Sequence, residues 1–582
     1  LWRILEKNLF VLSIIDLENG KQPMSTRNNS IHLIFNGEIF NYKRLRQEIE
    51  NFGYNFQTNS DTEVILLGYD LWGKRILDKL NGMFVFAILD SNKNEVFIAR
   101  DRFGMKPLYY LNDRNQFGFS TNINSLKYLK KYLTLNSNVL PIYFSQSFIP
   151  CPDTIYREVK KLPPAHYLIC NTKQNQIKLK RYWKPSFIPT IKQKDEMIDI
   201  LDQKMNLMAK NNVTSDVPFG AFLSGGIDST LILDYVLSNS NANINAYNIN
   251  FYEQSYSEKH HANYVSKKLS INLISKTLKH DYVSNIEKII DFHGEPFGDS
   301  SLLAAHYVSK IASKDVKMVV SGDGGDELFC GYAGYYDSII RNLLPIYNLK
   351  KDFQEGQIGG VLKNIIRWLL PQYSRNNIML SLINKDLRGA NFDLLFSNKQ
   401  NYTYKNGYIN ECHNIAKNST NYFDYLQIID LTYRLSNDFL TKVDIASMHN
   451  SIEARPILLD NNILDFALRS PLQYRANYKE KKIKGKLLLK YLLNKKGYKY
   501  RFINRNKKGF TIPLNYWFKK NKTARIMLED YIHSSITKSI LNTNYINYLI
   551  QEHEQTFDNS RILWYILVLS TWLEKNRQIK IN

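Results

Sequence analysis

The residues best suited to chemistry in this chain are a short run of small and polar side chains, residues 224–229, which read Ser-Gly-Gly-Ile-Asp-Ser. The run follows an apolar segment, residues 221–223, and precedes a helical pattern. A glycine turn between a strand and a helix points backbone N–H groups and a helix N-terminus at an anion, usually a phosphate. The hydroxyls of Ser224 and Ser229 can hold a pyrophosphate leaving group, and Asp228 can hold its Mg²⁺. The loop lacks the lysine of a Walker loop.

A second glycine-rich loop, residues 321–327, reads Ser-Gly-Asp-Gly-Gly-Asp-Glu and follows the strand-like run 316–320. Ligands of an open parallel sheet bind beyond the carboxyl ends of its strands, so we expect both loops to face one pocket. Asp228 and Asp326 are then predicted to share one Mg²⁺ between the phosphates of ATP. Either loop alone could be a plain tight turn, but two such loops in this order weaken that interpretation.

Charged residues alternate with apolar ones at helical spacing from Asp438 through Lys442 and Asp444. On its own, this pattern favours an amphipathic helix with solvated charges. Residues 505–513 are rich in basic side chains. These residues could be a surface basic loop. Alternatively, Lys507 could neutralise the departing pyrophosphate, because phosphoryl chemistry depends on positioning and charge stabilisation.

The first third of the chain offers a different site. Asn36 and Gly37 follow a strand-like run, and their side-chain amide and backbone N–H could stabilise an oxyanion. An Asn-Gly pair is also an ordinary β-turn. Asp61 could bind an amino group, or it could simply be a carboxylate favoured at a helix start by the helix dipole.

Two patterns of secondary structure must position these residues. Residues 9–182 carry short strands and two helical stretches, the second with a capping box formed by Ser60 and Glu63, so this half is expected to be α+β. A polar, proline-containing stretch, residues 183–194, is a predicted linker. From residue 195, strands alternate with longer helices, which predicts βαβ units and a parallel sheet, and the sequence after residue 331 is mainly helical.

Length and charge narrow the class of protein. A chain of 582 residues is long enough for at least two domains. The net charge of +23 could indicate a nucleic-acid partner. However, Lys, Asn, Ile and Tyr are abundant together, as an A/T-rich coding bias would produce, and no recognised nucleic-acid-binding module accompanies the charge. We therefore expect no nucleic-acid partner.

Cysteine usage and hydropathy indicate a reducing, soluble setting. Cys151, Cys170, Cys330 and Cys412 show neither CxxC spacing nor an adjacent histidine cluster, which argues against zinc and against a disulfide framework. The apolar run 562–573 is too short to span a bilayer and is predicted to be a buried core helix. No signal-peptide pattern opens the chain, so a cytoplasmic location without a membrane partner is expected.

Taken together, these segments resemble the glutamine-hydrolysing asparagine synthetases of the bacterial large-subunit type. The matching pieces keep the family order over the chain from about residue 10 and include residues 12–16, 36–42, 60–64, 80–84, 99–109, 161–164, 182–183, the two glycine-rich loops, 453–455, the Lys507 segment and 563–572.

The resemblance implies two domains. Residues 1–185 would be a class II glutamine amidotransferase domain, an α+β N-terminal-nucleophile glutaminase sandwich that is incomplete at its N-terminus. Residues 195–582 would be an α/β ATP-pyrophosphatase synthetase domain with a helical C-terminal part. Ammonia from glutamine would pass through an internal tunnel, and aspartate would be amidated through β-aspartyl-AMP with ATP and Mg²⁺. The partners would be small-molecule substrates, and a homodimer would be compatible with the family.

The family also implies roles for individual residues. Asn36 and Gly37 match its oxyanion hole, and Glu38 and Asp61 match its glutamine contacts. Asp323 and Lys507 match catalytic positions, Asp323 standing where Glu or Asp serves intermediate formation. The positions that match ATP, phosphate and Mg²⁺ contacts are Leu223, Ser224, Gly225, Gly226, Asp228, Ser229, Ile249, Ser321, Gly322, Asp326 and Lys507.

Departures from the family qualify this assignment. The chain begins at Leu1, which indicates processing or a partial reading frame, and the family's nucleophilic cysteine at the mature N-terminus is missing. Val11 replaces a glutamine-binding arginine, Ile445 stands at a position where the family has arginine, and Pro456 lies one place early. We therefore expect ammonia, rather than glutamine, to serve this chain.

Two alternatives to asparagine synthesis stay open, namely another carboxylate acceptor and nucleotide binding without catalysis. Residues 295–301 resemble a subgroup whose members modify other carboxylates, for example in surface polysaccharide assembly. A catalytically silent relative that only binds nucleotide is the third hypothesis.

Overall fold

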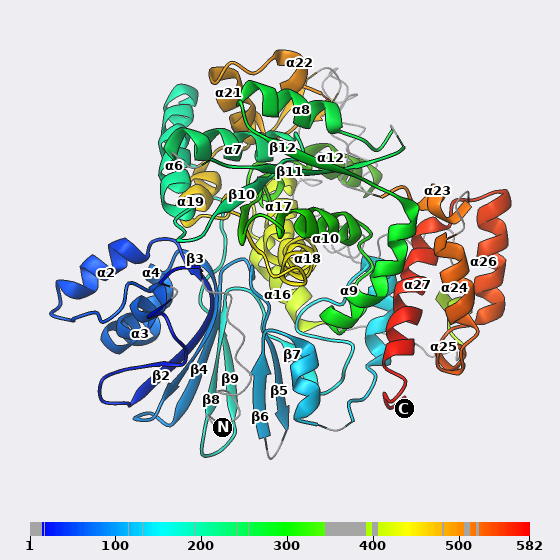
Figure 1. The fold of residues 1–582 in the computed structure, drawn as a ribbon, viewed down its shortest axis with the longest axis horizontal. Helices are drawn as coiled ribbons and strands as arrows, with labels where there is room; N and C mark the ends of the chain where they lie inside the picture. The colour runs from blue at the N-terminus through cyan, green and yellow to red at the C-terminus, as the bar shows by residue number, and fades with distance from the viewer. Residues whose placement is uncertain are drawn as a thin grey trace, which may run out of the picture.

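The computed structural model describes residues 14–16, 18–113, 116–130, 132–190, 193–240, 243–253, 255–343, 392–397, 406–479, 482–505, 512–519 and 523–581. Figure 1 shows two parts, each centred on a large sheet, with helices between and around them.

The first part is built on antiparallel strands. A six-stranded sheet has the order β1-β2-β3-β4-β8-β9, and a three-stranded sheet has the order β6-β5-β7. β3 is buried along almost its whole length because its alternate side chains enter two hydrophobic clusters, Phe84, Phe86 and Ile88 in one and Val85 and Ala87 in the other. The strands are β1 (Met24–Ser25), β2 (Ile31–Ile39), β3 (Gly82–Asp90), β4 (Glu95–Arg100), β5 (Tyr109–Asp113), β6 (Gln116–Ser120), β7 (Val159–Lys161), β8 (His166–Asn171) and β9 (Ile177–Arg181).

Helices pack on the six-stranded sheet, which confirms the predicted α+β character of this part. Leu45 and Ile49 of α2 and Val64 of α3 share one buried cluster with Leu33 and Phe35 of β2. The helical elements are α2 (Tyr42–Glu50), α3 (Asp61–Trp72), α4 (Ile76–Lys79) and α5 (Leu140–Gln146), with short 3-10 segments η1 (Gly73–Arg75), η2 (Ile123–Tyr128) and η3 (Ser137–Val139).

The start of α3 differs from the predicted capping box. Ser60 caps the helix, because its hydroxyl accepts a hydrogen bond from the Thr62 N–H at 3.1 Å. The Glu63 carboxylate instead accepts from the backbone N–H groups of Gln57 and Thr58, at 2.8 and 2.7 Å. Glu63 therefore closes the preceding loop and leaves the reciprocal half of the box unmade.

The second part is centred on a five-stranded parallel sheet with the order β12-β11-β10-β13-β14, as the alternation of strands and helices predicts. Its strands are β10 (Phe219–Phe222), β11 (Ala246–Phe251), β12 (Leu273–Leu278), β13 (Met318–Val320) and β14 (Glu453–Arg455). The helical elements before and between the first four strands are α6 (Lys194–Asn212), α7 (Ile227–Asn239), α8 (Lys259–Lys268), η4 (His280–Asn285), α9 (Ile286–His293) and α10 (Ser301–Ala312).

The described sequence after residue 331 is mainly helical, as predicted. One uninterrupted helical run consists of α17, the π-helical segment η5 and α18, and it lies between the two large sheets in Figure 1. The elements from residue 325 onward, apart from β14, are α11 (Gly325–Leu328), α12 (Ala333–Leu343), α15 (Phe392–Leu395), α16 (Gly407–Ala416), α17 (Tyr422–Ile429), η5 (Asp430–Phe439), α18 (Leu440–Met448), α19 (Asn461–Arg469), α20 (Leu472–Arg475), β15 (Asn477–Lys479), β16 (Lys482–Lys484), α21 (Leu487–Lys495), α22 (Tyr500–Ile503), α23 (Leu514–Lys519), α24 (Thr523–Ile532), α25 (Ser535–Ile540), α26 (Thr543–Gln555) and α27 (Ser560–Lys575).

The last helix, α27, is buried along most of its length, which confirms the predicted core helix. Among the residues that the structure describes, none of the helices combines the length and the hydropathy of a membrane-crossing segment.

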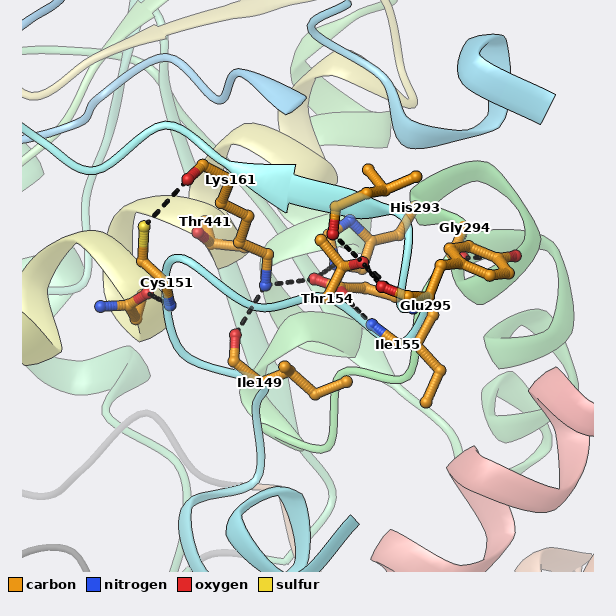
Figure 2. Close-up of polar contacts among 12 residues, drawn as sticks. Ile149, Cys151, Thr154, Ile155, Lys161, His293, Gly294, Glu295 and Thr441 are labelled. Atoms are coloured by element: carbon orange, nitrogen blue, oxygen red, sulfur yellow. Dashed lines mark hydrogen bonds and ion pairs between the residues drawn. The ribbon is translucent and has the colours of Figure 1, made fainter. Parts of the chain in front are cut away.

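A buried charge cluster joins the two parts of the chain. Lys161, at the end of β7, pairs with Glu295, which follows α9, at 2.5 Å, and its ammonium donates to the Ile149 carbonyl at 2.6 Å. The Ile155 N–H donates to the second Glu295 oxygen at 3.3 Å (Figure 2). Burial opposes ionisation of Glu295, yet Lys161 and His293 hold its pKa below the ordinary value. Glu295 therefore stays charged and ties the first part to the second.

This cluster predicts a large loss of stability in Glu295→Ala. The substitution leaves the Lys161 ammonium, only 14% exposed, without its carboxylate, and breaking such a buried pair costs about 3–5 kcal/mol. Urea denaturation at pH 7 measures the loss. Asp465→Ala is the matched control, because Asp465 and Arg469 form an exposed pair that contributes less than about 1 kcal/mol. Equal losses in the two variants would contradict the argument.

Candidate active site

The two glycine-rich loops meet at one edge of the parallel sheet. β10 and β13 are hydrogen-bonded neighbours, with Ala221 opposite Val320, so the loops that follow them leave the sheet together. Two glycines allow the contact. A Cβ at Gly322 would lie 2.9 Å from the Ser229 nitrogen, and a Cβ at Gly325 would lie 2.5 Å from Asp228 Oδ1. The second loop therefore lies directly against the start of α7.

The first loop brings its two hydroxyls side by side. The Gly226 N–H donates to Ser224 Oγ at 3.2 Å, and the Oγ atoms of Ser224 and Ser229 lie 3.1 Å apart. Gly225 has φ +76°, and a Cβ there would lie 2.6 Å from the Ala262 nitrogen, so this turn requires glycine. The hydroxyls consequently lie at the N-terminus of α7, where backbone N–H groups favour an anion.

The two carboxylates predicted to share a Mg²⁺ lie together, and a lysine joins them. Lys486 Nζ lies 2.7 Å from Asp326 Oδ1 and also contacts Asp228 Oδ2. Burial disfavours the charged lysine, but Asp228 and Asp326 outweigh it and raise the Lys486 pKa above its ordinary value. The position between the two carboxylates is thus one that holds a cation. Sequence reasoning missed Lys486, because a lysine-rich stretch before a helix reads as a solvated surface.

Further basic groups surround the first loop. Burial, together with Lys484 and Lys486, lowers the pKa of Lys490 to about 8. Arg505 donates to the Gly225 carbonyl at 2.7 Å and pairs with Glu258 at 2.7 Å. The predicted lysine of this basic segment, Lys507, lies outside the described residues.

A cavity of about 820 Å³ lies in front of the loops. The side chains from η5 and α18 that line it include Asp438 and Lys442, so the expectation that these charges are solvated is wrong. Asp438 is only 8% exposed. The physical reason is the place of the helical run, since α18 packs against α10 inside the second part. Its charged residues face a cavity instead of bulk water.

The predicted ATP and phosphate residues within the described part of the chain come together at this cavity, with Gly225 as the exception that packs behind it. Leu223 is buried and its carbonyl accepts from Asn248 Nδ2 at 2.7 Å. Ser321 donates to Asp323 at 2.7 Å, and burial raises the Asp323 pKa. The residues that line the cavity are Leu223, Ser224, Gly226, Asp228, Ser229, Ile249, Ser321, Gly322, Asp323 and Asp326.

The candidate oxyanion residues of the first part lie inside a strand. Asn36 and Gly37 belong to β2 and pair with Val85 and Phe84 of β3, so the β-turn alternative is wrong. Gly37 has φ +143°, and a Cβ there would lie 2.0 Å from the Met83 carbonyl oxygen. Close approach of the two strands therefore requires glycine at this position.

The two expected glutamine contacts already have partners within the chain. Glu38 pairs with Arg455 Nη2 at 2.8 Å, and Asp61 accepts a hydrogen bond from the Ile39 N–H at 2.9 Å. Arg455 is fully buried and also binds Glu453 at 2.7 Å. Burial raises the pKa of Asp61 to about 6. Their role toward glutamine stays a prediction.

A second cavity, of about 100 Å³, lies between the two parts. Asn36 lines it from the first part, and α18 lines it with Thr441, Asp444, Ile445 and Met448. The neighbouring α18 residues Lys442, Val443 and Ala446 line the large cavity, so α18 is a wall with one cavity on each side.

Of the three residues that depart from the family pattern, the structure describes Ile445 and Pro456. Ile445 is buried and presents an apolar side chain to the second cavity. The Pro456 carbonyl accepts a hydrogen bond from the Leu459 N–H at 2.9 Å, which closes a tight turn after β14. Val11 lies outside the described residues.

Both parts of the chain match family models of known proteins. Residues 10–183 match the family model of the glutamine amidotransferase domain, and residues 202–574 match that of asparagine synthase. Asparagine synthetase [glutamine-hydrolyzing] 1 of Bacillus subtilis (strain 168) is 31% identical over 577 residues, covering 96% of this chain and 88% of that protein. Asparagine synthetase [glutamine-hydrolyzing] 3 of the same organism is 28% identical and covers 57% of each chain.

A solved structure of glutamine phosphoribosylpyrophosphate amidotransferase from B. subtilis covers 44% of this chain and 48% of that chain, at 17% identity. Its TM-score of 0.20 is too low to support a conclusion. The asparagine synthase model alone spans more than half of the chain, and the first relative matches along almost all of it. The chain therefore belongs to the asparagine synthase family and is a ligase.

Proposed function

We propose that the chain catalyses the ATP-dependent amidation of aspartate to asparagine, through β-aspartyl-AMP and with release of AMP and pyrophosphate. The observation that carries this proposal is the pair of Asp228 and Asp326, held by adjacent parallel strands at one cavity with Lys486 between them. The B. subtilis relative, named as an asparagine synthetase, supports the same reaction.

The first step would form an acyl adenylate. A carboxylate oxygen of aspartate attacks the α-phosphorus of ATP, the bond to the β-phosphate breaks, and pyrophosphate leaves. Negative charge on the leaving group must be neutralised. Lys486 and Lys490 line the cavity near the first loop, where Ser224 and Ser229 offer hydroxyl donors.

The residues present fit a Mg²⁺ ion at the phosphate end. Mg²⁺ uses one or two carboxylates together with phosphate oxygens and water, and a cationic group already sits between Asp228 and Asp326. These two carboxylates would hold the ion. When bound, the ion supplies charge neutralisation for the phosphates of ATP.

The second step would transfer nitrogen. Ammonia attacks the acyl carbon, the bond to AMP breaks, and the attacking nitrogen loses a proton. Burial raises the pKa of Asp323, which makes its carboxylate a better proton acceptor, and Asp323 lines the cavity beside Ser321. We therefore assign Asp323 to that proton. The second cavity, with Asn36 at one side and α18 at the other, supports an ammonia route between the two parts.

Free ammonia is the proposed nitrogen donor for the chain of 582 residues. Hydrolysis of glutamine by a cysteine needs a reactive thiolate. All four cysteines are buried, and burial raises the pKa of Cys151 and Cys330 to about 12 and of Cys412 to about 11. Burial also raises the pKa of Cys170. These thiols stay protonated near pH 7, so none of the four is suited to the nucleophile's role.

Asp228→Asn is expected to lower pyrophosphate release from ATP and aspartate by about 100-fold or more, because the amide keeps the size of the side chain and loses the charge that holds the metal. A coupled pyrophosphate assay measures the rate. The exposed Asp465→Asn serves as control and should retain the full rate. Unchanged pyrophosphate release in Asp228→Asn would rule out this role.

Gly325→Ala tests the close approach of the two loops. Its Cβ would push the Asp228 carboxylate out of place, and the mobile end of that side chain can yield, so nucleotide affinity should fall about 10-fold, or about 1.4 kcal/mol, with little loss of folding stability. Equilibrium binding of ATP and thermal unfolding measure the two effects. Gly407→Ala is the control, since no atom of the described residues, apart from its own chain neighbours and helix backbone, lies within 4 Å of its Cβ position. Equal ATP affinity in both variants would contradict the contact.

The proposed nitrogen donor is tested by comparing ammonium with glutamine. With ATP and aspartate present, ammonium should support asparagine formation by this chain, and glutamine should not. Chromatographic quantification of asparagine and glutamate measures both. Production of glutamate from glutamine would refute the proposal on the donor and leave the proposed adenylation untouched.

A further inference from the structure

The second cavity combines a few charged side chains with apolar ones. Its volume of about 100 Å³ suits ammonia or a few water molecules and excludes a nucleotide. Taking an ion from water past apolar side chains is costly, and neutral ammonia avoids that cost. A donor that enters as ammonium is therefore expected to lose a proton before it passes. The apolar side chains that line the cavity include Met105, Phe292, Ile445 and Met448.

Asp444 supplies the negative charge at this cavity. Its Oδ1 lies 3.4 Å from Lys106 Nζ, a long contact, and its side chain is 15% exposed. Burial raises the Asp444 pKa, and Lys106, Arg100 and His293 oppose that rise. Arg100 also lines the cavity, but its guanidinium donates to the backbone carbonyls of residues 104, 106 and 162. The partly engaged Asp444 carboxylate can therefore take a further small cation.

His293 lines the same cavity and contacts a second carboxylate. The residue is 6% exposed, and its Nε2 lies 3.6 Å from Glu295 Oε1. Glu295 in turn pairs with Lys161, and Figure 2 shows the three side chains in one cluster. When a carboxylate faces one nitrogen of an imidazole, the other nitrogen can accept a proton, because the carboxylate stabilises the imidazolium that forms. Nδ1 is therefore the nitrogen that would receive a proton.

Other charged groups near His293 come from the elements that pack against α9, namely η2, η4, α18 and α27. Lys127 of η2 and Lys575 of α27 already have a hydrogen-bonding and an ionic partner, respectively. Asp281 of η4 is exposed. Among the described charged residues of these four elements, Asp444 alone lines the second cavity. Proton uptake by His293 thus depends on Asp444 and on the Glu295–Lys161 pair.

We propose that the second cavity binds ammonium at Asp444 and that His293 accepts its proton, so that neutral ammonia goes on to the acyl adenylate. The inference rests on the proposed function, in which free ammonia is the nitrogen donor, and adds the residues that prepare it. One N–H bond of ammonium breaks, its electron pair stays on nitrogen, and the proton bonds to His293 Nδ1. Asp323 takes the second proton, after the attack. Water removes the proton from His293 before the next turnover.

His293→Gln separates this role from a structural one, because glutamine can still donate toward Glu295 but cannot take up a proton. At pH 7, with ATP and aspartate present, the variant should lose about 100-fold in kcat/KM for ammonium, the size of a typical general-base contribution. Hydroxylamine is already neutral at pH 7, so formation of aspartate hydroxamate should keep the wild-type rate. The ammonium deficit should shrink at alkaline pH, where the solution itself supplies neutral ammonia. Chromatography quantifies both products.

ATP–pyrophosphate exchange with aspartate checks the fold and the phosphate site, and it should be equal in the wild type and His293→Gln. His553→Gln is the matched control, since His553 is a buried histidine that lines neither cavity. It should keep the wild-type kcat/KM for both nucleophiles. Asp444→Asn should raise the KM for ammonium about 10-fold and leave that for hydroxylamine unchanged, because only ammonium carries a charge.

Equal losses with both nucleophiles, or wild-type kinetics with ammonium at pH 7 in His293→Gln, would overturn the role of His293. If the wild type forms neither product, the proposed function fails, and ammonium binding still decides the inference. NMR spectra of protein with isotope-labelled histidine would then follow the His293 ring signal, assigned by its loss in His293→Gln. Ammonium chloride should shift that signal, and sodium chloride at the same concentration should not. An equal response to the two salts would overturn the ammonium site.

Discussion

The parallel pairing of β10 with β13 is the constraint on which the active-site geometry depends. It sends two glycine-rich loops from the same sheet edge into contact, and the absence of a Cβ at Gly322 and Gly325 lets them touch. Asp228 and Asp326 then lie close enough for one lysine ammonium to bind both. The placement of the Ser224 and Ser229 hydroxyls beside the second loop follows from this strand pairing, whereas Lys486 and Arg505 approach the first loop from other elements.

Much of this arrangement could be predicted from the sequence because it is local. The strand, turn and helix around Ser224 are encoded by adjacent residues, and so are those around Ser321. The alternation of strands and helices fixes the parallel sheet, whose carboxyl edge must hold both loops. Either loop alone could be a plain tight turn, but two such loops in this order, each after a strand, predict a shared site without any tertiary context.

The rest of the site depends on contacts distant in sequence, which spacing does not reveal. Lys486 reaches Asp228 across 258 positions, and nothing in its lysine-rich surroundings distinguishes it from a solvated side chain. Asp438 and Lys442 have the helical spacing of an exposed amphipathic face, and only the packing of α18 against α10 places them at a cavity. Similarly, Asn36 and Gly37 have turn-forming residue types but lie in a strand, because β3 pairs along their whole segment.

Arg455 has a consequence for how the two halves of this chain can change. Its buried guanidinium binds Glu38 of the first part and Glu453 of its own strand, while its carbonyl accepts the N–H of Ser321 in the second glycine-rich loop. A chimera that took its first half from a relative without a carboxylate at the Glu38 position would leave this guanidinium one partner short, immediately behind the loop. The two halves therefore cannot be exchanged freely between relatives, and we expect Glu38 and Arg455 to be retained together during evolution.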